Sequence, residues 1–330
     1  MPIVSIIVVT CGFGDYLRSC LDSIIEQTYK NFEIIVIDNS LRQGFAQELN
    51  RLYPMIKLYS SPENLFYCQG LNQGIKASNG EFTLCLNDDV VLDVRFLEEA
   101  LPGFAFAEDI GMVSAKILRR DRKIIDSTGL SLSMWRTAKE RGYAEKDTGQ
   151  YQKGGYIFGV NGAVAFYRRR MLENIKLGAD YFDSDFRAFY EDLDIAWRAQ
   201  KLGWKAYYLP TAIAYHTRGS SVREGRGLDK RYARRYLSNE LHFDLIKNRY
   251  LTIIKNETFL SFLLQLPFIL IYDIFVLGYI IFFKFSLIKL FFFHPIPINS
   301  AFRKRLIIKE KLRILRQNVA LMPRNSYSLI

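Results

Sequence analysis

The chain has 330 residues, 49% of them hydrophobic and 24% charged, with a formal net charge of +11. These values exclude a disordered or fibrous protein, because they supply enough apolar side chains for a large core. The positive charge does not predict nucleic-acid binding, since no helix-turn-helix, zinc-finger or RNA-binding motif accompanies it. Four cysteines without a CxxC pair favour a reducing compartment.

The first hundred residues alternate short apolar runs with amphipathic stretches. The runs predict strands at 4–9, 32–38, 56–59 and 81–87, and the stretches predict helices at 15–27, 45–52 and 69–77. This alternation is typical of a mostly parallel sheet covered by helices on both faces. The first run is too short for the core of a signal peptide, so we expect this body to stay in the cytoplasm.

Polar residues follow three of the predicted strands directly. Thr10 ends the first, Asp38 ends the second, and Asn87, Asp88 and Asp89 end the fourth. In a parallel sheet, ligands bind beyond the carboxyl ends of the strands. Adjacent carboxylates repel each other unless a cation lies between them, and Mg²⁺ is often held by one or two carboxylates with substrate phosphates. The alternative is a turn that caps a helix at 94–101, and the residues alone leave both open.

The middle of the chain predicts strands at 111–117 and 156–167 and helices at 168–175 and 192–202. The last helix starts with Glu191 and Asp192, which are either an acid–base pair at a cleft or an acidic first turn favoured by the helix dipole. His216 follows strands at 205–209 and 212–215 and could bind a metal or phosphate. The basic run 218–235 is either a lid over a diphosphate or a solvated face towards anionic lipid.

The C-terminal part contains an apolar stretch at 259–293 between two basic flanks. Both flanks favour the cytoplasm, which predicts a re-entrant hairpin or interfacial helices over a single span. Beyond the stretch, Ile308, Leu312, Leu315 and Val319 share one face of a predicted helix, as expected on anionic lipid. A core-packing helix or a partner interface is the alternative. We therefore expect a main domain at 1–235 and a membrane-associating helical region at 236–330.

Four segments, in the order in which they occur along the chain, resemble the family 2 glycosyltransferases. They are residues 4–40, residues 63–92 with LCLNDDVVL, residues 189–205 with FYEDLDIAW, and AYHTRGSS at 214–221. The resemblance covers about residues 3–250 and is closest to the bacterial rhamnosyltransferase-like branch that builds cell-surface polysaccharide. It implies a Rossmann-like, nucleotide-sugar-binding domain of GT-A type, a divalent metal (Mg²⁺ or Mn²⁺) and inversion at the anomeric carbon.

The resemblance also implies roles for individual residues. The nucleotide side is Thr10, Asp38, Asn64, Asn72 and Gly74, with Asn87 and Asp88 positioning the metal or the nucleotide. Asp89 is the metal ligand, His216 helps to hold metal and diphosphate, and Asp192, ahead of Glu191, is the catalytic base. Two departures from the family pattern, Cys11–Gly12 after Thr10 and LFYCQG after Asn64, leave the identity of the nucleotide open.

We therefore expect an inverting, metal-dependent glycosyltransferase at the cytoplasmic face of the membrane. It would move a sugar such as rhamnose from a dTDP-activated donor to a saccharide or lipid-linked saccharide acceptor. The expected partners also include an anionic membrane surface but no nucleic acid. The alternatives are a UDP- or GDP-sugar donor on the same scaffold, or a membrane-docked nucleotide-binding scaffold without catalysis.

Overall fold

The computed structural model describes residues 3–217 and 237–321 of the chain. Its centre is one large mixed sheet with the strand order β10-β12-β6-β11-β4-β1-β2-β3. The parallel part, in chain order, consists of β1 (Val4–Thr10), β2 (Phe32–Asp38), β3 (Lys57–Ser60) and β4 (Phe82–Asn87). Their bounds follow the apolar runs, and the predicted mostly parallel sheet is confirmed.

The second part of the sheet is mixed. It contains β6 (Ile110–Arg119), β10 (Gly155–Ile157), β11 (Val164–Arg168) and β12 (Lys205–His216). β11 runs antiparallel to both β4 and β6, whereas β12 runs parallel to β6. The short strand β5 (Val90–Leu92) pairs with β12 and β7 (Ile125–Ser127) pairs with β6, while β8 (Leu130–Leu132) and β9 (Ala138–Glu140) form a separate hairpin.

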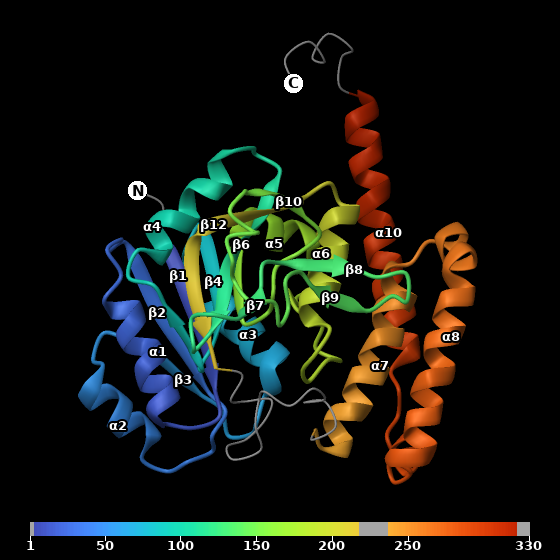
Figure 1. The fold of residues 1–330 in the computed structure, drawn as a ribbon, viewed down its shortest axis with the longest axis horizontal. Coiled ribbons are helices and arrows are strands. Elements are labelled where there is room, and N and C mark those ends of the chain that lie inside the picture. Colours follow the sequence, from blue (N-terminus) through green and yellow to red (C-terminus); the bar gives the residue numbers. More distant parts are fainter. Residues whose placement is uncertain (1–2, 218–236, 322–330) are drawn as a thin grey trace.

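Helices cover both faces of the sheet (Figure 1). One face carries α1 (Asp15–Ile25), α2 (Phe45–Leu52), α4 (Phe96–Ala100) and the 3₁₀ turn η1 (Leu101–Ala105). The other carries α3 (Phe66–Ala77), α5 (Arg169–Ile175) and α6 (Glu191–Lys201). Because side chains alternate along a strand, Ile6 and Val8 enter the first core while Ile7 and Val9 enter the second.

The C-terminal helices are α7 (Asn239–Asn256), α8 (Phe259–Phe283), α9 (Leu287–Phe293) and α10 (Ile298–Leu321). Leu251 of α7 and Ala301 of α10 share the second core with α3, α5 and α6. Described side chains from before and after the domain boundary expected at residue 235 therefore pack in the same hydrophobic core. Ile308, expected to face lipid, is buried in the protein, so that detail of the prediction is wrong.

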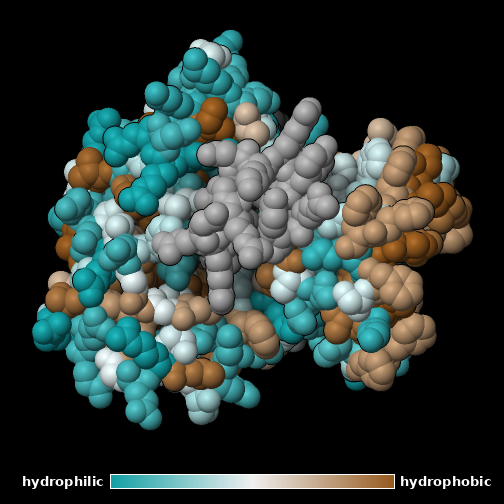
Figure 2. All heavy atoms as spheres, turned by 60° about the horizontal axis from the view of Figure 1, so that its bottom comes forward, coloured by the Kyte–Doolittle hydropathy of each residue, from teal (hydrophilic) through white to brown (hydrophobic). Residues whose placement is uncertain are grey.

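α8 lies beside α7, on the side of the molecule away from α1 and α2 (Figure 1). Among the described residues it is the one helix long and apolar enough to cross a membrane. Most of its large apolar side chains are exposed, including Phe259, Leu264 and Phe275. Figure 2 shows hydrophobic side chains gathered on this side, while the rest of the visible surface is largely hydrophilic.

Two expectations about strands are corrected. The strand predicted at 156–167 is broken into β10 and β11, and the strands predicted at 205–209 and 212–215 are one strand, β12, with irregular register between Leu209 and Ile213. The break has a local cause. Asn161 turns the chain by accepting a hydrogen bond from the Ala163 amide at 2.8 Å, and its own amide donates to Glu140 at 2.6 Å.

Candidate active site

The carboxyl ends of β1, β2 and β4 meet at one rim of the sheet. Thr10 and Asp38 are paired in register, and the Asn39 amide donates to the Thr10 carbonyl at 2.8 Å. The Thr10 hydroxyl donates to Asp88 at 2.7 Å, which links β1 to the end of β4. The pKa of Asp88 is raised to about 6, mainly by burial and also by the negative charge of the neighbouring Asp89, whereas the hydrogen bond from Thr10 lowers it.

Asp89 lies at one end of a buried chain of charged groups. His216, the last residue of β12, places Nε2 3.2 Å from Asp89 Oδ1 and Nδ1 2.8 Å from Asp126 Oδ2. All three side chains are almost fully buried. Burial alone would lower the pKa of His216, but the hydrogen bonds to Asp126 and Asp89, together with their charges, raise it to about 9.

These residues fit a divalent cation whose coordination is completed by phosphate oxygens. Asp126 accepts a hydrogen bond from Nδ1, which holds Nε2 towards Asp89, and this is how a carboxylate orients a metal-binding histidine. In residues 3–217 and 237–321, no group of three or more His, Cys, Asp or Glu side chains is arranged to hold an ion alone. Because Mg²⁺ commonly combines one or two carboxylates with substrate phosphates, Asp89 and His216 would hold it together with a diphosphate.

Two arginines lie beside Asp89. A pocket of about 250 Å³ is lined by Asp89, Arg120 and Arg122, and by Tyr16 of α1. Arg122 stacks over the ring of Tyr215, with its guanidinium carbon 4.5 Å from the ring centroid. Positive charge here suits a phosphate group. The basic run 218–235, expected to supply such charge, lies outside the described residues.

The structure separates the residues expected on the nucleotide side. Asp38 is buried at the rim, where it accepts hydrogen bonds from the Ser40 amide and the Ser60 hydroxyl. Asn64 is exposed, and its side chain accepts from the Phe66 amide at 2.7 Å. The Asn87 amide donates to the Ala163 carbonyl, which joins the ends of β4 and β11.

Asn72 and Gly74 lie away from the rim, in the interface between α3 and its neighbours. The Asn72 side chain is buried, donating to the Phe182 carbonyl and accepting from the Tyr181 and Phe182 amides, all at 2.9 Å. At Gly74 a side chain would meet Ile7 of β1, because a Cβ there would lie 2.5 Å from its Cγ2. Both residues hold α3 in place in this structure, so we do not assign them to the nucleotide.

Glu191 and Asp192 open α6 beside the loop between β10 and β11. The Gly162 amide donates to Asp192 Oδ2 at 3.2 Å and the Leu193 amide donates to Oδ1 at 2.7 Å. A side chain at Gly162 would crowd these carboxylates, because a Cβ there would lie 3.1 Å from Glu191 Oε1. Burial, followed by the charge of Asp192, raises the pKa of Glu191 to about 8.

The backbone before this pair is strained. Phe189 and Tyr190 both adopt left-handed conformations, with φ of 69° and 68°, which are costly for residues with large side chains. Asn248 of α7, itself fully buried, donates to the carbonyls of Ala188 and Phe189 at 2.8 and 2.9 Å. A residue almost sixty positions further along the chain thus holds the backbone that aims Glu191 and Asp192.

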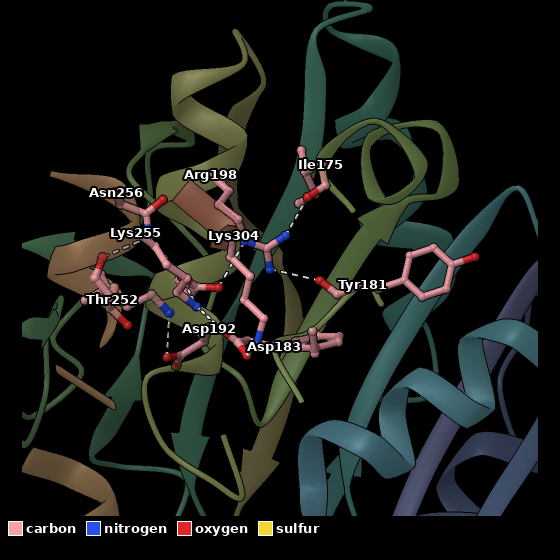
Figure 3. A network of polar contacts seen from close by, with 12 residues as sticks. Ile175, Tyr181, Asp183, Asp192, Arg198, Thr252, Lys255, Asn256 and Lys304 are labelled. Atoms are coloured by element: carbon pink, nitrogen blue, oxygen red, sulfur yellow. Dashed lines mark hydrogen bonds and ion pairs between the residues drawn. The ribbon is translucent and has the colours of Figure 1, made fainter. Parts of the chain in front are cut away.

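Buried ion pairs fix the rest of α6 and its preceding loop (Figure 3). Lys255 of α7 pairs with Asp183 and with Asp194 of α6, and Lys304 of α10 pairs with Asp183. Burial alone would raise the pKa of Asp183, yet the charges of the two lysines hold it well below its usual value. Arg198 joins the network by pairing with Asp194 at 3.0 Å. Removing one partner would leave an uncompensated buried charge, which is strongly destabilising.

Sequence reasoning missed Asp126 and Asn248. Asp126 had a usable signal, because it follows Ile124 and Ile125 in the same way that Asn87–Asp89 follow an apolar run. Asn248 had none, since an asparagine inside a helix has no local mark of what it contacts.

Comparisons with known proteins find similarity to glycosyltransferases. A 32% identical stretch matches an uncharacterized glycosyltransferase of Haemophilus influenzae, covering 30% of this chain and 31% of that protein. A poly-beta-1,6-N-acetyl-D-glucosamine synthase of Staphylococcus aureus is 20% identical over 61% of this chain and 47% of its own length. The chain thus spans between about a third and a half of these relatives.

A crystal structure of GalNAc-T7 with UDP, GalNAc and Mn²⁺ superposes with a TM-score of 0.58 at 13% identity, covering 77% of this chain and 48% of that one. It confirms the predicted GT-A type fold. The rhamnosyltransferase-like branch stays a prediction. The sequence model of the family described as "Glycosyl transferase family 2" matches residues 5–176, which is more than half of the chain. The chain therefore belongs to glycosyl transferase family 2.

Proposed function

We propose that this chain is an inverting, divalent-metal-dependent hexosyltransferase of cell-surface polysaccharide synthesis. It takes a nucleoside-diphosphate sugar, with dTDP-rhamnose as the first donor to test, and extends a lipid-linked saccharide. Two hydrogen bonds carry the proposal: the Gly162 backbone amide donates to Asp192, and the Asn87 backbone amide donates to the carbonyl of the next residue, Ala163. They connect the Glu191–Asp192 pair to the end of β4, where Asp89 begins the Asp89–His216–Asp126 chain. The saccharide acceptor is also supported by the similarity to a polysaccharide synthase.

The donor side of the proposed reaction must stabilise charge on the departing diphosphate. A bound divalent cation supplies this as a Lewis acid. Asp89 and His216 would hold the cation, and Asp126 keeps the imidazole oriented. Arg120 and Arg122 line the pocket next to Asp89 and can donate to phosphate oxygens.

The acceptor side must remove a proton from the attacking hydroxyl. Asp192 is our base, because two backbone amides hold its carboxylate in a fixed orientation. Glu191 is protonated at neutral pH, since its pKa is about 8, and so leaves the negative charge to Asp192. A base acting on the hydroxyl opposite the leaving group gives direct displacement, and hence inversion at the anomeric carbon.

The test uses the purified full chain with dTDP-rhamnose, UDP-sugars and GDP-sugars, each with Mg²⁺, Mn²⁺ or EDTA. We expect transfer from one donor class that EDTA abolishes, and NMR of the product should show the inverted anomer. A thermal-shift series with the free nucleoside diphosphates runs in parallel, because a ligand that binds only the folded state raises the Tm. Transfer with retention would overturn the mechanism, and neither transfer nor any shift would leave a non-catalytic protein on this fold.

We also propose that α8 places the enzyme on the membrane surface without crossing the bilayer. Polar contacts tie α8 to the protein body along its length. Arg136 donates to Ser261 near its start, Arg249 pairs with Asp273 in its middle at 2.7 Å, and Lys284 after its end donates to the Leu237 carbonyl. A helix that crossed the membrane would have to leave these partners. Its exposed apolar face is instead suited to an interfacial position.

Vesicle flotation tests this placement. Phe275→Glu puts a charge on the exposed apolar face of α8, and Met55→Glu makes the same change at an exposed apolar residue after α2. We expect the first variant to lose binding to neutral phosphatidylcholine vesicles and the second to retain it. Equal binding by both variants would show that α8 is not the membrane contact.

A further inference from the structure

An open pocket of about 550 Å³ lies between the C-terminal end of α6, the turn from α7 to α8, and α10. It is separate from the site at the strand ends. Five of its ten lining residues are basic and one is acidic. The basic residues are Lys201, Arg305, Lys309, Arg313 and Arg316.

Four of the basic residues come from one stripe of α10. Their spacing along the helix is four, four and three residues, which places them on the same face. Next to this stripe, Ile308 is buried and Leu312 is packed against the second core. The packing of α10 on the protein therefore fixes the direction in which its basic stripe points.

The positive charge of the pocket is poorly balanced by the protein. The lining acid, Glu257, is already paired with Arg136. Within residues 3–217 and 237–321, Lys201 and Arg305 donate only to main-chain carbonyls near the end of α7, those of Asn256 and Ile254. Arg313 pairs with Glu310 at 2.7 Å, whereas Lys309 and Arg316 form no ion pair with any residue in the described part of the chain.

The pKa of Lys201 is consistent with this excess of positive charge. Its pKa is lowered to about 8, first by burial and then by the nearby charge of Arg305. An anion in the pocket would relieve this repulsion.

The lip of the pocket is apolar. Phe259, which lines it, and Leu260 are the first two residues of α8 and are 75% and 69% exposed. They begin the apolar surface that continues along α8. A ligand with a charged phosphate and an attached hydrocarbon chain would match both the basic wall and this lip.

We propose that the pocket binds the phosphate of an anionic phospholipid headgroup, with the acyl chains lying along the start of α8. Basic pockets beside membrane helices bind such headgroups through the same chemistry. Free phosphate shares the charged group but has nothing to place against Phe259 and Leu260. The choice of a lipid rests on the membrane position of α8 proposed above.

The experiment measures flotation of the full chain with phosphatidylcholine vesicles and with vesicles that also contain phosphatidylglycerol. Arg316→Glu removes a pocket charge, and Arg303→Glu makes the same change at an exposed residue of α10 outside the lining. We expect the wild type to prefer phosphatidylglycerol, Arg316→Glu to lower that partition at least about fivefold, and Arg303→Glu to lower it less than about twofold. Transfer to a water-soluble acceptor should be unchanged in both variants.

Each other outcome overturns the inference in a distinguishable way. Equal losses in the two variants would mean diffuse attraction without a pocket. Equal binding of the wild type to both vesicle types would remove the headgroup site but keep the membrane position of α8, and no flotation at all would remove both. Inorganic phosphate is added at constant ionic strength as a last control. If it raises the Tm of the wild type but not that of Arg316→Glu, and also displaces the wild type from vesicles, the ligand is soluble phosphate and the lipid assignment is wrong.

Discussion

The two sides of the candidate active site are built differently. On the donor side, Thr10 and Asp38 are the last residues of regular strands, Asp89 follows the end of β4, and His216 ends β12. On the base side, Asp192 follows two left-handed residues at a helix start. Asn248 of α7 holds that backbone, and Lys255 of α7 and Lys304 of α10 hold the nearby Asp194 and Asp183 side chains.

This difference shows what the C-terminal helices contribute. Strand ends are positioned by sheet hydrogen bonds, so the donor side depends mainly on the central fold. The base side depends on contacts between residues more than fifty positions apart, which must all form before Asp192 is aimed. We therefore expect changes in α7 to act on the acceptor step more than on donor binding.

The largest expected effect is the loss of the base. Asp192→Asn should lower kcat about 10²- to 10⁴-fold, because the amide cannot take the proton of the acceptor. Donor binding, measured by titration with the nucleoside diphosphate, should stay close to that of the wild type. Asp15→Asn, the same change at an exposed position of α1, is the control. Normal turnover in Asp192→Asn would show that another group is the base.

A second change tests the donor side. Asp126→Asn removes the carboxylate that orients His216, and we expect it to weaken Mn²⁺ binding in the presence of diphosphate about 10- to 100-fold. Mn²⁺ titration followed by electron paramagnetic resonance measures this without an activity assay. The melting curve checks that the variant is folded, since Asp126 is fully buried. Unchanged Mn²⁺ affinity in a folded variant would remove the orienting role of Asp126.

A third change tests whether α7 positions the base. Asn248→Asp keeps the shape but removes the two N–H donors to the strained backbone, whereas Asn50→Asp makes the same change on the exposed surface of α2. We expect Asn248→Asp to lose about 2 kcal/mol of stability, because buried carbonyls lose their partners. Well below its Tm, its kcat should fall about tenfold with little change in donor KM. Equal loss of kcat and donor binding would indicate general unfolding.

The difference between local strand ends and long-range contacts also explains which features could be predicted from the sequence. The strand ends carrying Thr10, Asp38 and Asp89 were predictable, because period-2 and period-3.6 patterns are local and the carboxyl ends of parallel strands converge. The break at Phe158–Ala163 was missed because its apolar residues continue the strand pattern on both sides. The burial of Ile308 was missed because an amphipathic helix has the same pattern whether its apolar face meets lipid or protein.

The smallest expected effect concerns the proton on Glu191. Its pKa is about 8 in the folded protein and about 4.3 in an unfolded chain, so between these values only the folded state keeps the proton. The stability that this proton supports is complete at low pH and is lost as the pH rises towards 8. Glu191→Gln cannot lose a proton, so its Tm should exceed that of the wild type by a few degrees at about pH 8 and differ little at about pH 5. Parallel curves for the two proteins across this range would show that Glu191 is ionised when folded, and the separation of roles between Glu191 and Asp192 would then fail.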